Sequence, residues 1–210
     1  MELQGKIINF LGDSITEGHG TSGEEKRFSN LIKEKYGLLK ANNYGISGTR
    51  IAKQKNPSEN PRHDLYFCGR LDEMDKNADA VVVFGGTNDY GHGDAPFGLF
   101  TDRTDETFYG ACHTLMSKLA STYVGKSVVI VTPLHRTEET RNARVLENYV
   151  NAIKEVARYY SLPVLDLYAS SGIQPSVPTI REKLCPDGLH PNDAGHEILA
   201  EKIANFLKTV

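Results

Sequence analysis

The sequence has few cysteines, no long apolar run and no signal peptide. Its three cysteines, Cys68, Cys112 and Cys185, are odd in number and far apart, and no two have the spacing of metal ligands. We therefore expect free thiols in a reducing compartment. No apolar run approaches the roughly 20 residues that span a bilayer, and residues 1–6 lead directly into an apolar segment without a signal-peptide pattern. These absences predict a cytoplasmic protein that does not act at a membrane.

An excess of charge of one sign is also absent, since 24 basic and 27 acidic residues give a formal net charge of −3. No basic stripe indicates a nucleic-acid partner, and no polybasic run indicates an anionic membrane surface. The 210 residues contain no repeat or low-complexity segment, and 39% are apolar, as is ordinary for a globular protein. We expect residues 1–210 to form one domain with a small-molecule partner, and the oligomeric state is left open.

Short apolar runs alternate with segments of helical periodicity along the chain. The clearest run, residues 80–84, is β-branched and continuous, which is typical of a parallel strand buried on both faces. The alternation predicts an α/β fold with a five-stranded parallel sheet in the order 2-1-3-4-5 and helices on both faces. Strands are predicted at 6–11, 39–44, 80–84, 127–131 and 163–167, and helices at 24–36, 65–76, 104–123, 145–160 and 193–207. Loops are predicted at 53–63, from 85 to about 102, and at 169–186.

Glycines and small polar residues follow almost every predicted strand. Ligands of open parallel sheets bind beyond the carboxyl ends of the strands, so these segments are expected at one functional edge. The segments are Gly12–Ser14, Asn43–Gly48, Gly86–Asp89, Pro133–Arg136 and, just before the last helix, Asp187–Pro191.

These segments contain the groups that acyl transfer requires. A serine hydroxyl such as that of Ser14 is a weak nucleophile and needs an adjacent base, for which His190 is the best candidate. Asp187, three residues earlier, can accept a hydrogen bond from this imidazole and fix its tautomer. An oxyanion hole could use the backbone N–H groups of Ser14 and Gly48 and the side-chain amide of Asn88.

Four motifs resemble those of the SGNH (GDSL-like) hydrolase family of esterases and lipases. The motifs Gly12-Asp13-Ser14, Asn43-x-Gly45-x-x-Gly48, Gly86-x-Asn88-Asp89 and Asp187-x-x-His190 stand in the order of that family and together span residues 7–196. The resemblance implies a three-layer, flavodoxin-like fold and serine-dependent ester hydrolysis without a metal or other cofactor. It also implies a catalytic role for Ser14, Asp187 and His190 and an oxyanion role for Gly48 and Asn88. The missing Gly-x-Ser-x-Gly sequence argues against an α/β-hydrolase.

Other polar residues near these motifs have alternative interpretations. Asp13 is expected to cap the following helix. Asp89, His92 and His135 are candidate substrate contacts. A structural role that orients the loop after Asn88 is favoured for Asp89, and a solvated side chain is the alternative for His92 and His135. No HxH, HExxH or DxD spacing supports a metal site.

The sequence therefore predicts a serine esterase that removes a small acyl group, such as acetyl, from a carbohydrate or similar polar alcohol. Polar loops at 15–23, 53–63 and 90–103, without large apolar residues for an acyl-chain tunnel, favour the polar substrate. A lysophospholipase or thioesterase of the same fold is an alternative. A non-catalytic carbohydrate-binding relative and a metal-dependent phosphohydrolase are others, although a binding module would not need Ser14, Asp187 and His190 together.

Overall fold

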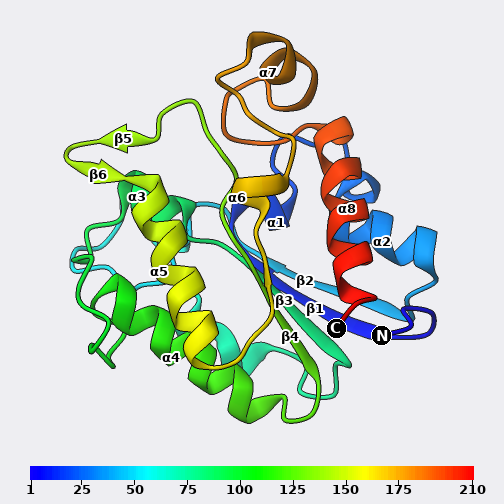
Figure 1. Cartoon of the computed structure of the whole chain (residues 1–210), viewed down its shortest axis with the longest axis horizontal. Helices are drawn as coiled ribbons and strands as arrows, with labels where there is room; N and C mark the ends of the chain where they lie inside the picture. The colour runs from blue at the N-terminus through cyan, green and yellow to red at the C-terminus, as the bar shows by residue number, and fades with distance from the viewer.

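The computed structural model, which describes residues 1–210, contains one parallel sheet of five strands in the order β2-β1-β3-β4-β7. This order confirms the predicted one, because the two strands numbered between β4 and β7 form a separate antiparallel hairpin (Figure 1). The sheet strands are β1 (Ile7–Gly12), β2 (Lys40–Gly45), β3 (Ala80–Phe84), β4 (Ser127–Val131) and β7 (Val164–Leu165), and the hairpin is β5 (Thr140–Arg141) with β6 (Arg144–Val145).

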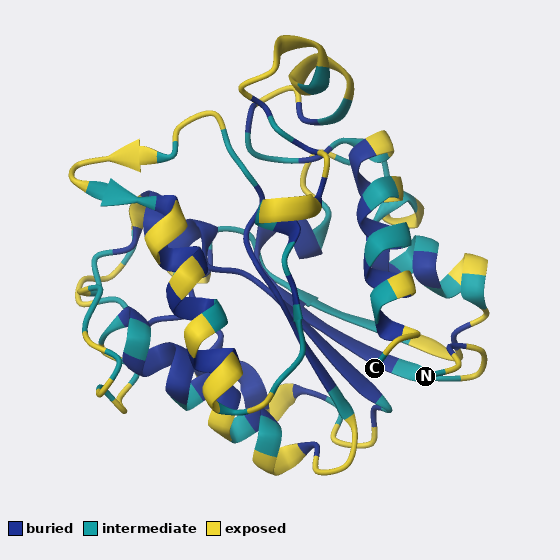
Figure 2. Ribbon diagram, in the orientation of Figure 1, coloured by how far each residue is buried: buried dark blue, intermediate teal, exposed yellow.

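Helices cover both faces of the sheet. The helices α4 (Phe108–Thr122) and α5 (Leu146–Tyr159) pack on one face, and α2 (Phe28–Tyr36) and α8 (Asp193–Leu207) pack on the other. Figure 2 shows that the central strands between them are buried, whereas the edge strand β2 is only partly buried, and that the outer sides of the helices are exposed. Shorter helices occupy the connections: α1 (Ser14–Glu17), η1 (Glu24–Lys26), η2 (Pro61–Asp64), η3 (Cys68–Glu73), α3 (Thr87–His92), α6 (Leu167–Ser170) and α7 (Pro178–Leu184).

The central strand β3 supplies side chains to two separate apolar cores. Val81 and Val83 belong to a cluster of 27 buried residues beneath α4 and α5. Val82 and Phe84 belong to a cluster of 22 buried residues beneath α2 and α8. Because successive side chains of a strand point to opposite faces, a sheet covered on both sides needs an apolar residue at every position. This explains the continuous apolar run at 80–84.

Two of the predicted loops contain α-helices. Residues 87–92 form α3, although Gly91 and Gly93 indicate a loop, so the predicted loop is wrong for these residues, whereas 93–102 contains no helix or strand. The carbonyl of Gly93 accepts a hydrogen bond from the Arg144 side chain at 2.6 Å, so a residue distant in sequence stabilises the end of this helix. In the segment 169–186, Pro178 begins α7, where a missing N–H costs no helical hydrogen bond.

Other predicted elements are shorter than expected. The helix predicted at 65–76 is only the short 3-10 helix η3, because the Arg70 side chain binds the Leu65 carbonyl and the end of β1. The strand predicted at 163–167 is reduced to β7, since the Asp166 carboxylate caps α6 by accepting from the Ala169 N–H. The helix predicted at 24–36 divides at Arg27, which has an extended conformation.

The structure is also informative about the cysteines and about membrane insertion. Cys68, Cys112 and Cys185 are all buried and unpaired, as expected. None of the helices combines the length and the apolar character required to cross a lipid bilayer.

Candidate active site

Ser14 is the first residue of α1, directly after the turn at the carboxyl end of β1. A Cβ at Gly12 would lie 1.9 Å from the Thr16 hydroxyl oxygen and 2.8 Å from the Phe84 carbonyl oxygen, so the turn requires glycine. Asp13 caps the helix, as predicted, by accepting a hydrogen bond from the Ile15 N–H at 3.0 Å. Burial raises the pKa of Asp13 to about 7. The turn holds the Ser14 side chain at the sheet edge, where it is 6% exposed.

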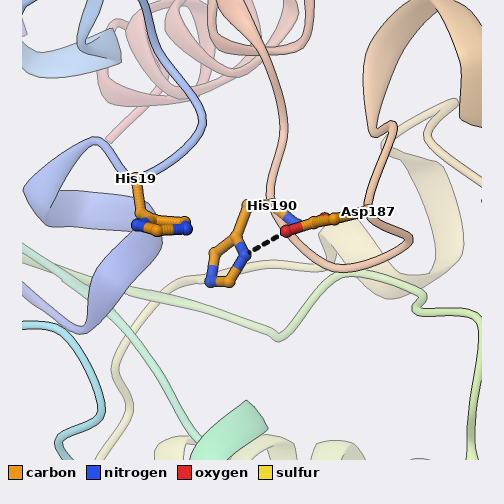
Figure 3. Close-up of side chains that lie close together, drawn as sticks. All are labelled: His19, Asp187 and His190. Atoms are coloured by element: carbon orange, nitrogen blue, oxygen red, sulfur yellow. Dashed lines mark hydrogen bonds and ion pairs between the residues drawn. The ribbon is translucent and has the colours of Figure 1, made fainter.

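The hydroxyl of Ser14 lies next to an imidazole that a carboxylate orients. Ser14 Oγ is 3.0 Å from His190 Nε2. Figure 3 shows the other side of the imidazole, where His190 Nδ1 is 2.6 Å from Asp187 Oδ2. The second carboxylate oxygen of Asp187 accepts from the backbone N–H groups of Leu189 and His190 at 2.9 and 2.7 Å. Gly188, at φ +80°, allows the tight turn that brings these groups together.

The electrostatics of this pair favour a neutral imidazole beside an ionised carboxylate. Burial lowers the pKa of His190, although the hydrogen bond to Asp187 acts in the opposite direction. Burial raises the pKa of Asp187, but hydrogen bonds from His190 and Leu189 outweigh this effect and lower it overall. At neutral pH, His190 can therefore accept a proton at Nε2.

Three N–H donors could bind an oxyanion beside the Ser14 hydroxyl: the backbone N–H groups of Ser14 and Gly48 and the side-chain amide of Asn88. The backbone N–H groups of Ser14 and Gly48 donate no hydrogen bond within the chain. Gly48 has φ +76°, and a Cβ there would lie 2.3 Å from the His63 ring. The Asn88 amide donates one hydrogen to the Thr49 carbonyl at 2.9 Å, which leaves its second hydrogen for another acceptor.

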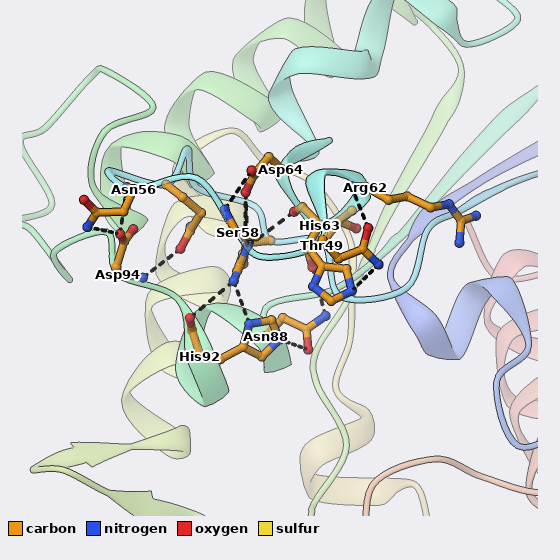
Figure 4. Close-up of polar contacts among 12 residues, drawn as sticks. Thr49, Asn56, Ser58, Arg62, His63, Asp64, Asn88, His92 and Asp94 are labelled. Carbon is orange, nitrogen blue, oxygen red and sulfur yellow. Dashed lines mark hydrogen bonds and ion pairs between the residues drawn. The ribbon is translucent and has the colours of Figure 1, made fainter.

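The orientation of the Asn88 amide is set by a hydrogen-bonded chain. His92 Nε2 is 3.1 Å from Asn88 Oδ1, and Arg50 donates from Nη2 to His92 Nδ1 at 2.7 Å (Figure 4). Because Arg50 can only donate, Nδ1 must accept, and the hydrogen of the neutral ring stands on Nε2. Burial and the Arg50 charge lower the pKa of His92 to about 4, so this tautomer is kept at neutral pH. Arg50 is not among the site residues predicted from the sequence. Its position two residues after Gly48 was the one indication that it could lie near the site.

A cavity of about 240 Å³ opens over these groups. Ser14, Gly48, Asn88 and His190 line it, and Leu189 is its one apolar lining residue. His92, Arg136 and Arg141 also line it, which places His92 where a substrate contact was predicted. The site is therefore a small cleft lined mainly by polar residues and glycines, without a tunnel of large apolar side chains.

Asp89 and His135, the other two predicted substrate contacts, do not line this cavity. The Asp89 carboxylate is buried and accepts hydrogen bonds from the backbone N–H groups of Ile51 and Ala52, both at 2.9 Å. Burial raises its pKa to about 7. His135 lies 2.6 Å from Glu139, and its ring packs against Tyr168. Asp89 therefore supports the loop that follows Gly48, and His135 belongs to a separate polar cluster.

One cluster of side chains beside Ser14 has the residue types of a metal site. His19, Asp187 and His190 each offer a ligand atom, and these atoms lie within 4.8 Å of one another. The ring of His19 packs against that of His190, with centroids 4.2 Å apart, while His190 points its Nδ1 at Asp187. In this structure His190 has both ring nitrogens in contact with other side chains, Nδ1 with Asp187 and Nε2 with Ser14.

A parallel α/β sheet that carries a serine, an imidazole, a carboxylate and free N–H donors at its carboxyl edge has the architecture of an ester hydrolase. The profile of the GDSL-like Lipase/Acylhydrolase family matches residues 10–198, and the chain belongs to this family. The predicted family membership is thereby confirmed.

Known proteins similar to this chain include enzymes of ester hydrolysis. A solved structure of a protein from Lactobacillus plantarum is 28% identical, with a TM-score of 0.85 and 98% of each chain covered. A lipase/acylhydrolase from Enterococcus faecalis is 25% identical, with a TM-score of 0.67, covering 97% of this chain and 96% of the other. The acetylxylan esterase of Xylanibacter ruminicola is 24% identical over 94% of this chain and 42% of its own length. The chain thus spans less than half the length of that relative.

Proposed function

We propose that the chain is a serine esterase in which Ser14 is the nucleophile, His190 the general base and Asp187 the residue that orients the base. The observation that carries the proposal is the continuous hydrogen-bonded chain from Ser14 through His190 to Asp187, with distances of 3.0 and 2.6 Å. Membership in a family of ester hydrolases supports it. The arrangement needs no metal or other cofactor for acyl transfer.

The reaction proceeds in two steps through an acyl-enzyme. Ser14 Oγ attacks the ester carbonyl as His190 Nε2 takes its proton, and the resulting oxyanion accepts hydrogen bonds from the N–H groups of Ser14, Gly48 and Asn88. His190 then protonates the departing alcohol. Water attacks the acyl-enzyme with His190 again as the base, which releases the acid and restores Ser14. Each oxyanion donor contributes about 3–4 kcal/mol to lowering the barrier.

The proposed substrate carries a small acyl group, such as acetyl, on a carbohydrate or similar polar alcohol. The cavity of about 240 Å³ with Leu189 as its one apolar lining residue favours a short acyl chain over the long chains of lysophospholipase or thioesterase substrates. Similarity to an acetylxylan esterase supports the same choice. The complete hydrogen-bonded chain argues against a purely carbohydrate-binding role. A cytoplasmic location stays a prediction.

Replacing Ser14 tests the mechanism. The Ser14→Ala variant should lose kcat/KM for p-nitrophenyl acetate by about 10⁴-fold or more, because no nucleophile remains. A fluorophosphonate should label the wild type at Ser14 and leave the variant unlabelled. Ester hydrolysis by the wild type should be unchanged by EDTA.

The matched control is Ser121→Ala, which removes a hydroxyl that bonds only within α4 and should keep wild-type activity. Activity that survives Ser14→Ala, or that EDTA removes, would contradict the serine mechanism. Absence of both ester hydrolysis and labelling would instead favour the binding module.

A further inference from the structure

A second cavity, of about 330 Å³, adjoins the one above Ser14. The two cavities share Gly91, His92 and Arg141 in their linings, so the cleft continues from the nucleophile toward the β5–β6 hairpin. Its volume is within the range of about 300–1,000 Å³ typical of ligand sites. This second cavity is where the part of a substrate remote from the reacting ester would lie.

The linings of both cavities are rich in arginine and contain no carboxylate. Arg136 and Arg141 line the cavity above Ser14, and Arg141 and Arg144 line the second one. No aspartate or glutamate is among the lining residues of either cavity. The chain as a whole has more acidic than basic residues, so its composition does not explain this concentration of positive charge.

The three arginines have almost no ionic partners within the protein. Arg136 and Arg144 form no ion pair, and the ion pair of Arg141 with Glu138 has a length of 4.0 Å with both side chains about half exposed. An exposed ion pair of this length contributes little to stability. Arg136 lies over the ring of Tyr90 and donates from Nη1 to Thr87, whose atoms are 3.3–3.4 Å away.

Backbone carbonyls hold the guanidinium groups in place and leave donors free. Arg144 donates from Nη1 to the Gly93 carbonyl, and Arg141 donates from Nη1 to the Gly91 carbonyl at 3.2 Å. Neither side chain donates from Nη2 within the chain. Since a guanidinium has five N–H donors in a planar fork, each can still bind the oxygens of an anion.

The hairpin places two of these like charges directly opposite each other. Arg141 on β5 pairs with Arg144 on β6 across a two-residue turn, Asn142 and Ala143, in which both φ angles are positive. Like charges at opposed positions destabilise a two-stranded pair, and an isolated hairpin has little stability of its own. A bound anion would relieve this repulsion. The positive charge is also felt at His92, whose pKa is lowered partly by Arg136 and Arg141.

We propose that the arginines 136, 141 and 144 form a subsite for a negatively charged group on the alcohol portion of the ester. The preferred substrate would then be a small acyl ester of an acidic sugar, with its ester carbonyl at Ser14 and its carboxylate at Arg141 and Arg144. This inference rests on the proposed esterase function for its catalytic readout, but the binding of an anion does not depend on it.

A matched substrate pair tests the subsite. An O-acetylated uronic acid and the corresponding uronamide have the same shape and differ in charge. At low ionic strength the acid should have the higher kcat/KM for acetate release by about tenfold or more. Arg141→Gln and Arg144→Gln should each reduce this ratio severalfold, and Arg158→Gln, an exposed charge on α5, should leave the ratio at the wild-type value.

Binding measurements separate this inference from the proposed mechanism. Calorimetric titration of the Ser14→Ala variant should show tighter binding of the intact acetylated acid than of the amide, and added salt should weaken only the former. An O-acetylated hexose phosphate in the same titration tests whether the subsite prefers a carboxylate or a phosphate. If the phosphate binds more tightly than the acetylated uronic acid, the choice of a carboxylate is overturned. Equal binding of acid and amide, with p-nitrophenyl acetate still hydrolysed by the wild type, would overturn the subsite and leave the esterase intact. Charge-selective binding without any ester hydrolysis would support the subsite and contradict the esterase.

Discussion

Among single residues, His92 decides which way the Asn88 amide faces. An amide turned by half a rotation would present its oxygen, not its N–H, to the oxyanion. The hydrogen bond from His92 Nε2 to Asn88 Oδ1, together with the bond from Asn88 Nδ2 to the Thr49 carbonyl, prevents this rotation. We therefore regard His92 and Arg50 as positioning residues for the proposed oxyanion hole.

Loss of this hydrogen bond should lower the rate of the chemical step. We expect His92→Leu to lower kcat about tenfold with little change in KM, and Asn88→Ala to lower kcat by about 10²–10³-fold. His92→Gln, which keeps an N–H donor, should restore part of the loss. Steady-state kinetics of the double variant His92→Leu/Asn88→Ala tests whether His92 acts through Asn88. If it does, the double variant should have the same kcat as Asn88→Ala alone. Additive losses would show that His92 acts on catalysis independently of Asn88.

Among the elements, Arg70 in η3 connects the ends of the first two strands to the loop after Gly48. Its guanidinium is buried and donates to the Gly12 carbonyl and to the Thr49 hydroxyl, both at 2.9 Å, and also to the Tyr44 carbonyl. Burial lowers the pKa of Arg70 to about 10, which keeps it charged at neutral pH. One side chain therefore satisfies carbonyls from two strands at the edge where the site is built.

Removal of the Arg70 guanidinium should destabilise the protein strongly. Arg70→Met leaves these buried acceptors without donors, and we expect the free energy of unfolding in urea to fall by about 3–5 kcal/mol. Arg158→Met, the same change at an exposed position, should alter it by less than about 0.5 kcal/mol. A loss at Arg70 no larger than at Arg158 would show that the connection adds no stability.

For the whole molecule, buried titratable groups determine how stability responds to pH. His196 is 0% exposed, accepts from the Phe28 N–H at 3.1 Å, and has a pKa lowered to about 4, chiefly by burial. The unfolded chain binds a proton at this histidine near pH 6.5, while the folded chain does not. Its contribution to stability is therefore fully present above pH 6.5 and is lost as the pH falls toward 4. Asp13 and Asp89, with raised pKa values, act in the opposite direction.

Comparison with a variant isolates the effect of His196. His196→Gln keeps an acceptor for the Phe28 N–H and removes the titration. Between pH 7 and pH 5 the wild type should lose about 2 kcal/mol more unfolding free energy than the variant, measured by urea denaturation at each pH. Parallel losses in the two proteins would show that His196 does not contribute to the pH dependence.

The sequence by itself determined the sheet, the family and the order of the site motifs. Apolar runs such as residues 80–84 carry their periodicity locally, and parallel strands bring their carboxyl ends to one edge whatever the packing of the helices. Ser14, Asp187 and His190 could therefore be selected from the sequence motifs alone.

The tertiary structure alone decided how the surroundings of the site are built. Gly91, Gly93 and Pro178 indicate loops locally, but the Arg144 side chain binds the carbonyl at the end of α3, and Pro178 occupies the first turn of α7. Asp89 stands next to a site residue in sequence, yet its carboxylate is buried against another loop. Arg141 and Arg144 lie about 50 residues from the carbonyls that hold them. Such contacts depend on side-chain packing between segments far apart in the chain, which local sequence patterns do not encode.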